Sequence, residues 1–276
     1  MIEVYGSGWC SSASMVRMGT TMPIFWIGGT PGSGKSTIAR QLARELDLAL
    51  HPIDAYTYDH VARLGTLGPS LDDVLALGAS AAADDFERTS ALRLPAVMDD
   101  VRAAQVGGVP TLVEGPQLHP RAAPAWSPIG AIWLITTAER TRAARQQRLV
   151  DATHADHVRM EALVERDTVI GARLRSAAAD AGRTVVEVPT NVDWDLVMAA
   201  VREAVNTAAA AFERLRPGRE LSARRRHENH VVHRQIVAHE RHIGATLPAF
   251  PYACQCGRSG CTDTIPATSD AYRTRD

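Results

Sequence analysis

Lysine is almost absent from this chain: it has 276 residues and thirty basic side chains, and Lys35 is the only lysine among them. Lys35 belongs to Gly29-Thr30-Pro31-Gly32-Ser33-Gly34-Lys35-Ser36, which matches the phosphate-loop pattern G-x-x-x-x-G-K-[ST]. A compact ammonium group acts there as a point charge on the outer phosphates of a nucleotide, in a space that a planar guanidinium does not fit. The single lysine therefore predicts a nucleotide-dependent protein.

Other features are also scarce, and each scarcity excludes a class of protein. The formal net charge is only -1, so no overall field draws the chain to nucleic acid or to a membrane. No apolar run reaches the about 20 residues of a membrane-spanning helix, and the first residues do not resemble a secretory signal. Only four cysteines are present, one at position 10 and three near the end, so a disulfide framework is not expected. We expect a cytoplasmic protein.

Three segments divide the chain. Residues 1–21 are small, polar and aperiodic, and we expect a disordered tail; Met22 is an alternative start position. Residues 22–216 alternate apolar and helical stretches, the order that produces a parallel sheet with crossover helices. After Pro217, residues 217–276 should form a basic helix or linker and then a cysteine-rich tail. The predicted strands are 23–28, 48–53, 111–113, 131–135 and 184–188, and the predicted helices are 35–46, 72–77, 95–106, 139–149, 160–181 and 194–215.

The phosphate loop predicts a set of nucleotide contacts. Its glycines let backbone N–H groups turn toward a phosphate, and the start of the following helix adds about half a positive charge. Ser36 is placed to ligate Mg²⁺. The predicted nucleotide-binding residues are Gly29, Thr30, Gly32, Ser33, Gly34, Lys35, Ser36 and Thr37.

Carboxylates follow two of the predicted strands, Asp54 after the second and Glu114 after the third. The carboxyl ends of parallel strands open on the same crevice, so both can bind Mg²⁺ directly or through water. Asp54 could also take a proton from an acceptor hydroxyl. A turn or capping role for Asp54 and a loop salt bridge for Glu114 are the alternatives. Glu114 could also position the acceptor, and Asp59 is a weaker carboxylate candidate for which a plain surface residue is the alternative. Other candidates for acceptor binding are Gln117, Tyr56, Tyr58 and His60, and the last three also fit ordinary packing or surface.

Arginines are dense after the fourth predicted strand. We predict that Arg142 and Arg145 are catalytic residues on a mobile lid, because cations that close over a transferring phosphoryl group stabilise its charge. A solvated helix face is the alternative. Weaker candidates of the same kind are Arg140, Arg148, Arg166, Arg173 and Arg175. Residues 191–194 follow the fifth strand, where a loop that binds the nucleobase could lie.

The phosphate loop, the aspartate after the second strand and the arginine-bearing segment together resemble the P-loop small-molecule and nucleotide kinases, among them shikimate, gluconate and adenylate kinases. The resemblance covers residues 23–205. It implies a three-layer P-loop NTPase α/β fold whose five-stranded parallel sheet has the order 2-3-1-4-5, the use of ATP and Mg²⁺, and a catalytic base at Asp54. The D-x-D of shikimate kinases is absent, because Asp54 is followed by Ala55 and Tyr56. The substrate family therefore stays open.

The C-terminal tail holds a second candidate site. Cys254, Cys256 and Cys261 are thiols of the kind that bind Zn²⁺, which takes four ligands, and His239 or His242 could supply the fourth. Free or redox-active thiols are the alternative. The basic run 224–226 could contact nucleic-acid phosphates, and a solvated helix or linker is the alternative there.

These features predict an ATP-dependent phosphotransferase with a small hydroxyl- or phosphate-bearing acceptor and with Lys35, Asp54, Arg142 and Arg145 as catalytic residues. The expected partners are a nucleotide and that acceptor, without a membrane or nucleic acid. Two alternatives remain. One is a toxin-like kinase or a kinase that acts on nucleic-acid ends. The other is a non-enzymatic, nucleotide-dependent switch or assembly protein whose tail binds a protein partner.

Overall fold

A computed structural model describes residues 4–5, 22–65, 68–147 and 153–273. Its main sheet has the order β1-β6-β5-β2-β4-β3, in which only β1 (Val4–Tyr5) is antiparallel to its neighbour. The parallel strands are β2 (Ile24–Gly29), β3 (Ala49–Pro52), β4 (Thr111–Glu114), β5 (Gly130–Thr136) and β6 (Thr184–Val188). Numbered from β2 onward, the parallel strands have the order 2-3-1-4-5, so the predicted five-stranded parallel sheet is confirmed.

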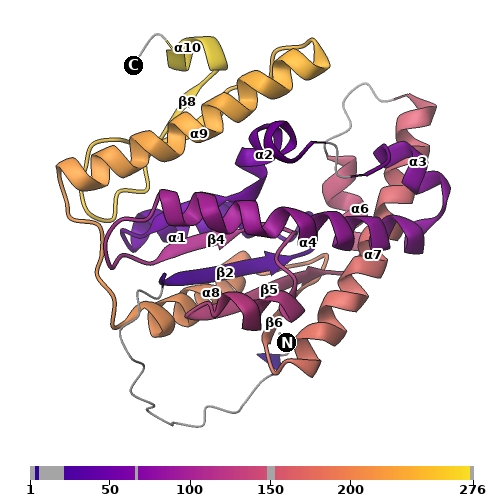
Figure 1. Ribbon diagram of the computed structural model, residues 1–276, viewed down its shortest axis with the longest axis horizontal. Coiled ribbons are helices and arrows are strands. Elements are labelled where there is room, and N and C mark those ends of the chain that lie inside the picture. The colour runs from indigo at the N-terminus through magenta and orange to yellow at the C-terminus, as the bar shows by residue number, and fades with distance from the viewer. Residues whose placement is uncertain (1–3, 6–21, 66–67, 148–152, 274–276) are drawn as a thin grey trace.

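Helices cover both faces of this sheet, and Figure 1 shows the layers. The helices are α1 (Lys35–Glu45), α2 (Thr57–Leu64), α3 (Leu71–Ala76), α4 (Ala79–Ala103), α5 (Ala123–Trp126), α6 (Ala138–Gln146), α7 (His154–Asp180), α8 (Trp194–Ala209), α9 (Arg219–Ile243) and α10 (Ser269–Arg273). Two 3₁₀ turns are η1 (Ile53–Tyr56) and η2 (Pro120–Ala122), and a separate hairpin is formed by β7 (Phe250–Ala253) and β8 (Thr264–Ala267).

The fully apolar sequence of β2 reflects burial on both faces. Phe25 and Ile27 belong to a core shared with α1 and α8, whereas Ile24 and Trp26 belong to a core shared with α4 and α7. Successive strand residues point to opposite faces, so one strand supplies both cores. This central strand holds the phosphate loop at its carboxyl end, over the middle of the sheet.

One predicted helix is much longer than the sequence pattern suggested. The expectation that it begins at Pro95 is wrong, because α4 begins at Ala79 and contains Pro95 in its interior. An internal proline opposes a helix by about 3 kcal/mol. The alanine-rich stretch before it favours helix, and Leu94, Val97 and Met98 pack in the core on either side of the proline. Burial of this face outweighs the local preference.

The C-terminal segment packs against the rest of the molecule. In Figure 1, α9 runs along the top of the molecule with α10 and β8 beside it, and α9 contacts η1, α2 and β3. Arg224 and Arg225 are buried, so the interpretation of this run as a solvated helix or a surface for nucleic-acid phosphates is wrong for these two residues. Arg225 donates to the carbonyls of Leu48 and Ala43, and both arginines pair with buried Glu228. These arginines hold α9 to the sheet.

Within the tail predicted to be disordered, Val4 and Tyr5 pair with Val186 and Val185 at the edge of the sheet; the rest of residues 1–21 lies outside the described range. Among the described helices, none combines the length and the apolarity needed to cross a membrane.

Candidate functional site

The phosphate loop connects the end of β2 to the start of α1. Gly32 and Gly34 have φ angles of +81° and +80°, a region that side chains rarely adopt. A Cβ at Gly32 would lie 2.7 Å from that of Ala144 on α6, and one at Gly34 would lie 2.6 Å from the Trp194 ring. The loop therefore needs glycine both for its backbone turn and for the close approach of α6 and Trp194.

Lys35 lies over this loop at the start of α1. Its Nζ donates to the Thr30 carbonyl at 2.7 Å, and the side chain is mostly buried. The Thr30 hydroxyl lies 2.7 Å from that of Thr136, which lies 2.7 Å from that of Thr141. This chain of hydroxyls joins the loop to the end of β5 and to the first turn of α6, the arginine-bearing helix.

Ser36 and Glu114 meet beside the loop. The Ser36 hydroxyl donates to Oε2 of Glu114 at 3.1 Å, and only 2% of Glu114 is exposed. Burial raises the pKa of Glu114, and the charge of Asp54 raises it further, while Lys35 and Arg40 oppose the shift. Two neighbouring carboxylates and a hydroxyl form an all-oxygen donor set of the kind that suits Mg²⁺. The residues present therefore fit the metal that the P-loop resemblance implies.

Asp54 lies in η1, two residues beyond the end of β3. The side chain is exposed, and its Oδ1 accepts a hydrogen bond of 3.0 Å from the Gln117 amide in the loop after β4. The strands β3 and β4 pair Pro52 with Glu114, which brings the two strand ends together as the topology predicted. Asp54, Glu114 and Gln117 thus lie together at the carboxyl ends of β3 and β4, and Ser36 contacts Glu114 there.

Two arginines that the sequence analysis did not select support this site. Arg40 lies one helical turn after Ser36 on α1, and the charges of Glu114 and Asp54 oppose the lowering of its pKa by burial. Buried Arg93 on α4 donates to the carbonyl of Ile53 at 2.7 Å and so holds the turn that carries Asp54. The sequence could have indicated Arg40, because residues four apart on a helix share a face and Arg40 is four residues after Ser36. Arg93 gave no such indication, because its contacts are distant in sequence.

The predicted lid arginines lie on α6 and bind carboxylates of α7. Arg142 pairs with Glu161 at 3.0 Å, and both side chains are more than 40% exposed. Arg145 donates from Nε to Asp167 at 2.9 Å, and the Asp167 side chain is fully buried. Arg148 lies outside the described residues. The structure therefore places Arg142 and Arg145 on one helix next to the loop, in ion pairs of very different burial.

Trp194 and Arg140 form an aromatic and cationic pair on the other side of the loop. The guanidinium carbon of Arg140 lies 5.3 Å from the centre of the Trp194 ring. Trp194 is 38% exposed, and its ring is the neighbour that a Cβ at Gly34 would meet. A flat exposed surface lies next to the phosphate loop here, in the segment where the sequence suggested a nucleobase.

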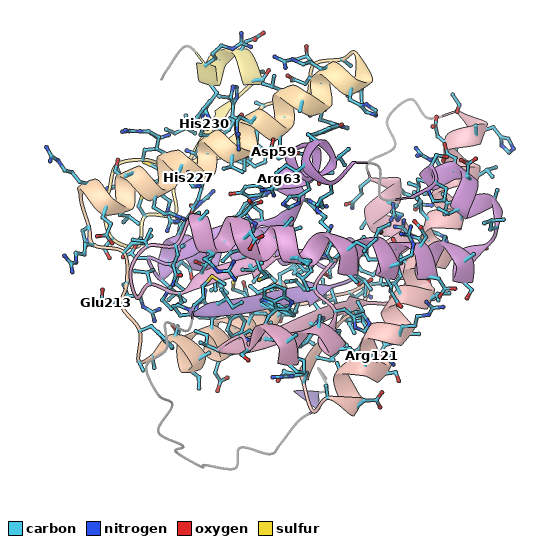
Figure 2. The ribbon with its side chains drawn as sticks, viewed as in Figure 1. Asp59, Arg63, Arg121, Glu213, His227 and His230 are labelled. Carbon is cyan, nitrogen blue, oxygen red and sulfur yellow. The ribbon has the colours of Figure 1, made fainter. Side chains whose placement is uncertain are left out.

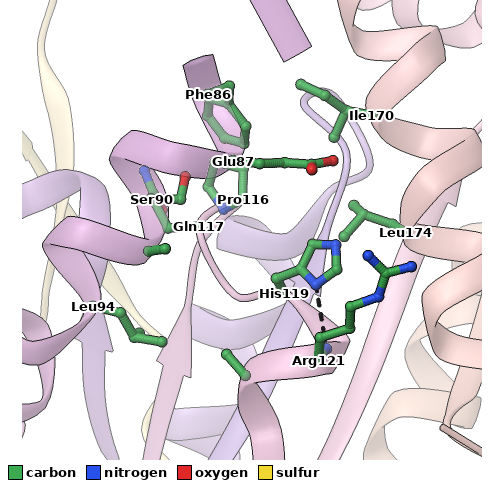
Figure 3. A pocket seen from close by; sticks show the side chains of 12 residues that line it. Phe86, Glu87, Ser90, Leu94, Pro116, Gln117, His119, Arg121, Ile170 and Leu174 are labelled. Atoms are coloured by element: carbon green, nitrogen blue, oxygen red, sulfur yellow. Dashed lines mark hydrogen bonds between the residues drawn. The ribbon is translucent and has the colours of Figure 1, made fainter. Parts of the chain in front are cut away.

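A cavity of about 320 Å³ has Gln117 in its wall, and Figure 3 shows the residues that line it. The walls are mostly apolar, from Phe86 and Leu94 of α4 to Ile170 and Leu174 of α7. Two buried oxygens of lining residues, Oε1 of Gln117 and Oε1 of Glu87, have no hydrogen-bond partner. Since buried acceptors are nearly always paired, these two oxygens are unsatisfied polar groups beside an otherwise mostly apolar wall.

The other acceptor candidates make contacts within the protein. Tyr56 is buried and stacks on His51 with ring centres 4.3 Å apart, which favours the packing interpretation. Tyr58 bonds to His239 and Asp59 to Arg234, both on α9. Figure 2 shows Asp59 and Arg63 on α2, beside α9 with His227 and His230. The remaining candidates are paired as follows: His60 with Asp100 and Arg93, Arg166 with Asp167, Arg173 with Asp84 and Glu87, and Arg175 with Glu187.

The three tail cysteines converge, but the histidines proposed to join them do not. The Sγ atoms of Cys254, Cys256 and Cys261 lie within 4.8 Å of one another. His239 bonds to the Tyr58 hydroxyl at 2.9 Å, toward the far end of α9 from the residues that contact the cysteine loop. Asn229 is the α9 residue that bonds to Ala253, directly before Cys254, and at 1.5 Å per residue the 10 residues from Asn229 to His239 span about 15 Å. A fourth ligand from His239 or His242 is therefore excluded.

Comparisons with known proteins give distant structural matches alone. No protein-family model and no curated protein matches the chain. A candidate kinase from Chloroflexus aurantiacus matches with 16% identity over 67% of this chain and 99% of that chain, with a TM-score of 0.37. A sugar kinase from a Janibacter species matches with 17% identity over 68% of this chain and 97% of that chain, with a TM-score of 0.38. An uncharacterized protein from Eubacterium ventriosum matches with 11% identity over 67% of this chain and 99% of that chain, with a TM-score of 0.39. At such low similarity, the residues of the site alone carry the functional argument.

Proposed function

We propose that this protein is a P-loop phosphotransferase that moves the terminal phosphoryl group of ATP to a small hydroxyl-bearing acceptor. The observation that carries the proposal is the proximity of Lys35, Ser36 and Glu114 at the carboxyl ends of β2 and β4, beside a loop whose glycines have positive φ angles. A cation, a hydroxyl and a carboxylate at one helix N-terminus form a site for a phosphate and its metal. Such sites accelerate transfer by position and charge.

Mg²⁺ would be held by Ser36, Glu114 and, directly or through water, Asp54. The metal supplies positive charge that neutralises the phosphates when it is bound. Lys35 binds the outer phosphates, and the loop amides bind their oxygens. The nucleobase lies on the exposed surface formed by Trp194 and Arg140. Stacking on that surface would accept any base and so does not distinguish ATP from GTP. The experiments therefore use ATP and compare it with GTP.

The acceptor binds in the cavity beyond Gln117. Its apolar walls suit an acceptor with an apolar body, and the unpaired oxygens of Gln117 and Glu87 suit hydroxyl or amino donors. A hydroxyl bound to Oε1 of Gln117 lies near Asp54, because the amide of the same side chain donates to Asp54. Asp54 then orients that hydroxyl and accepts its proton as the oxygen attacks phosphorus. The cavity is lined by both Glu87 and Arg121, so its charges do not exclude a phosphate on the acceptor.

The two lid arginines differ in how easily they can be redirected to a phosphate. The Arg142–Glu161 pair is exposed, and exposed pairs stabilise by only about 0–1 kcal/mol. The Arg145–Asp167 pair involves a fully buried carboxylate, and breaking a buried pair costs about 3–5 kcal/mol. Arg142 is therefore the arginine that turns to the transferring group, while Arg145 holds α6 on α7.

The test measures nucleotide binding and phosphoryl transfer separately. Calorimetry with Mg²⁺ and ATP should show binding to the wild-type chain and a large loss for Lys35→Ala, with transfer from labelled ATP reduced by orders of magnitude. A panel of small alcohols and sugars then identifies the acceptor. Equal binding and equal transfer by the Lys35→Ala variant would refute the proposal.

A pair of tryptophan substitutions on α4 tests the acceptor cavity. Ala91→Trp should fill the cavity and abolish transfer while ATP binding is retained, because Ala91 lines it. Leu92→Trp is the matched control, since Leu92 is 52% exposed and lines no part of the cavity. Transfer at the wild-type rate by the Ala91→Trp variant would place the acceptor elsewhere.

A further inference from the structure

The C-terminal hairpin brings three sulfurs together from both ends of a short loop. Cys254 and Cys256 follow β7, and Cys261 precedes β8. Gly257 and Gly260 have positive φ angles, +73° and +65°, which let the chain reverse direction between Cys256 and Cys261. Among the described residues, these cysteines are the one group of three or more His, Cys, Asp or Glu whose ligand atoms converge.

The spacing of the sulfurs suits a tetrahedral zinc ion. With Zn–S bonds of about 2.3 Å, sulfurs in a tetrahedron lie about 3.8 Å apart. The three sulfurs lie within 4.8 Å of one another, so small side-chain movements would bring them to the spacing of a zinc site. A positive charge is already next to the sulfurs, since Arg258 lies 3.5 Å from the Cys256 sulfur and 3.9 Å from that of Cys261. This charge offsets part of the negative charge of three thiolates.

Asp263 is the carboxylate next to the cluster, and its exposed side chain would have to turn toward the sulfurs to complete the set, because its oxygens are not within 4.8 Å of all three. Its Oδ2 lies 3.6 Å from the Cys261 sulfur and 3.1 Å from Arg258, on the exposed side of the loop. The histidines of α9 are excluded by their distance along the helix. A carboxylate oxygen is an accepted zinc ligand at about 2.0–2.2 Å. Three thiolates and one carboxylate close a four-coordinate site and leave no open position for catalysis.

The loop that carries the cysteines also binds the end of the phosphate-loop helix. The Gly260 amide donates to Oδ1 of Asp47 at 3.0 Å, and the Ser259 hydroxyl donates to the other oxygen of this carboxylate. Asp47 follows Leu46, the C-cap of α1. The Gly218 amide, just before α9, donates to the carbonyl of Gly257 at 2.8 Å. Whatever fixes this loop therefore fixes α1 and α9 to each other.

The hairpin has little apolar core with which to hold this shape alone. Its cluster of buried hydrophobic residues comprises Tyr252, Ala267 and Tyr272. We propose that Cys254, Cys256, Cys261 and Asp263 form a structural Zn²⁺ site that fixes the C-terminal segment to the end of α1. Zinc bound only to the folded segment stabilises it by the free energy of binding.

Metal content of the full-length protein tests this directly. Elemental analysis of protein purified without a histidine tag should find about one zinc per chain, and the Cys261→Ser variant should hold less than a tenth of that. Cys10→Ser is the matched control and should keep its zinc, because Cys10 is the one cysteine that is not a proposed ligand. Zinc-free wild-type protein, or equal zinc in the wild type and in Cys261→Ser, would overturn the proposal.

The ligand set and the structural role need two further measurements. Cobalt-substituted protein should show thiolate charge-transfer absorption and tetrahedral d–d bands. The d–d bands should change in Asp263→Asn, whereas an unchanged spectrum would exclude Asp263 as a ligand. A chelator should lower the Tm of the wild type and leave that of Cys261→Ser unchanged. A disulfide between two of these cysteines, found by mass spectrometry in zinc-free protein, would replace the metal site by a redox pair.

Discussion

The hydroxyl of Ser36 donates to the carboxylate of Glu114 across 3.1 Å, although 78 residues separate them. The contact joins the first turn of α1 to the end of β4, and it exists because β2 and β4 are adjacent parallel strands with Ile27 beside Glu114. Parallel strands place their carboxyl ends together, so a loop after one strand meets a side chain at the end of the next. The proposed metal and phosphate chemistry rests on this relationship.

Replacing Glu114 by glutamine should make the nucleotide-free protein more stable but weaken its binding of Mg²⁺–ATP. The pKa of Glu114 is raised by burial and by Asp54, so the folded protein holds its proton more tightly than the unfolded chain does. Ionisation of Glu114 therefore destabilises the fold above that pKa, and the destabilisation vanishes below the unfolded value of about 4.3. Glu114→Gln should raise the Tm of nucleotide-free protein at pH 7–8, with a gain that shrinks toward pH 4.

The same variant should bind ATP more weakly when Mg²⁺ is present, because it loses a charged oxygen ligand. Thermal unfolding at several pH values and calorimetry with and without Mg²⁺ measure the two effects. Glu203→Gln on α8, which is exposed, should change neither. A Glu114→Gln protein that is less stable at neutral pH and binds Mg²⁺–ATP normally would remove Glu114 from the site.

Asp54→Asn should slow transfer far more than it weakens nucleotide binding, because Ser36 and Glu114 remain to hold the metal. If Asp54 accepts the proton of the acceptor hydroxyl, its loss should lower kcat by about 10²–10⁴, while the KM for ATP stays nearly constant. Asp59→Asn is the control, since Asp59 pairs with Arg234 and its side chain is 45% exposed. Steady-state kinetics with the acceptor identified by the panel measures both constants. Loss of ATP affinity with unchanged kcat would remove the proton-accepting role and leave Asp54 with the metal alone.

Trp194→Ala should weaken nucleotide binding and remove a fluorescence signal. Stacking of a base on an aromatic ring contributes about 1–3 kcal/mol, so the Kd for ATP should rise by about 5- to 150-fold. ATP should also quench the tryptophan fluorescence of the wild type more than that of the variant. Leu196→Ala is the control, because Leu196 is 54% exposed on the same helical turn. An unchanged Kd would place the base elsewhere.

The sequence predicted local elements and adjacent strand ends far better than it predicted contacts between distant segments. Alternating apolar stretches were sufficient for the parallel sheet, because each strand had to be buried on both faces. Patterning in α9 showed a basic helix, but the burial of Arg224 and Arg225 depends on carbonyl groups of Leu48, Leu50 and Ala43, which no local pattern reveals. The role of Arg93 behind Asp54 escaped for the same reason. Charged residues without a local partner were expected to face solvent, but these three arginines are buried because they pair with groups that are distant in sequence.

The buried pairing of α9 gives the last prediction, which concerns stability. Arg225→Gln should lower the free energy of unfolding by about 3–5 kcal/mol, because it leaves Glu228 buried with one partner fewer. Arg226→Gln, at the next position but exposed, should change it by less than about 0.5 kcal/mol. Urea denaturation compares the two variants.

The pH dependence of the same cluster supplies the check. Burial by itself would raise the pKa of Glu228, but the charges of Arg225 and Arg224 outweigh burial and hold the pKa below its ordinary range. The stabilisation from this carboxylate is therefore present above its unfolded pKa of about 4.3 and is lost as the pH falls through the folded value. Glu228→Gln should be much less stable than the wild type at pH 7 and should approach it in acid. A stability difference that stays constant down to pH 3 would show that Glu228 contributes by shape and not by charge.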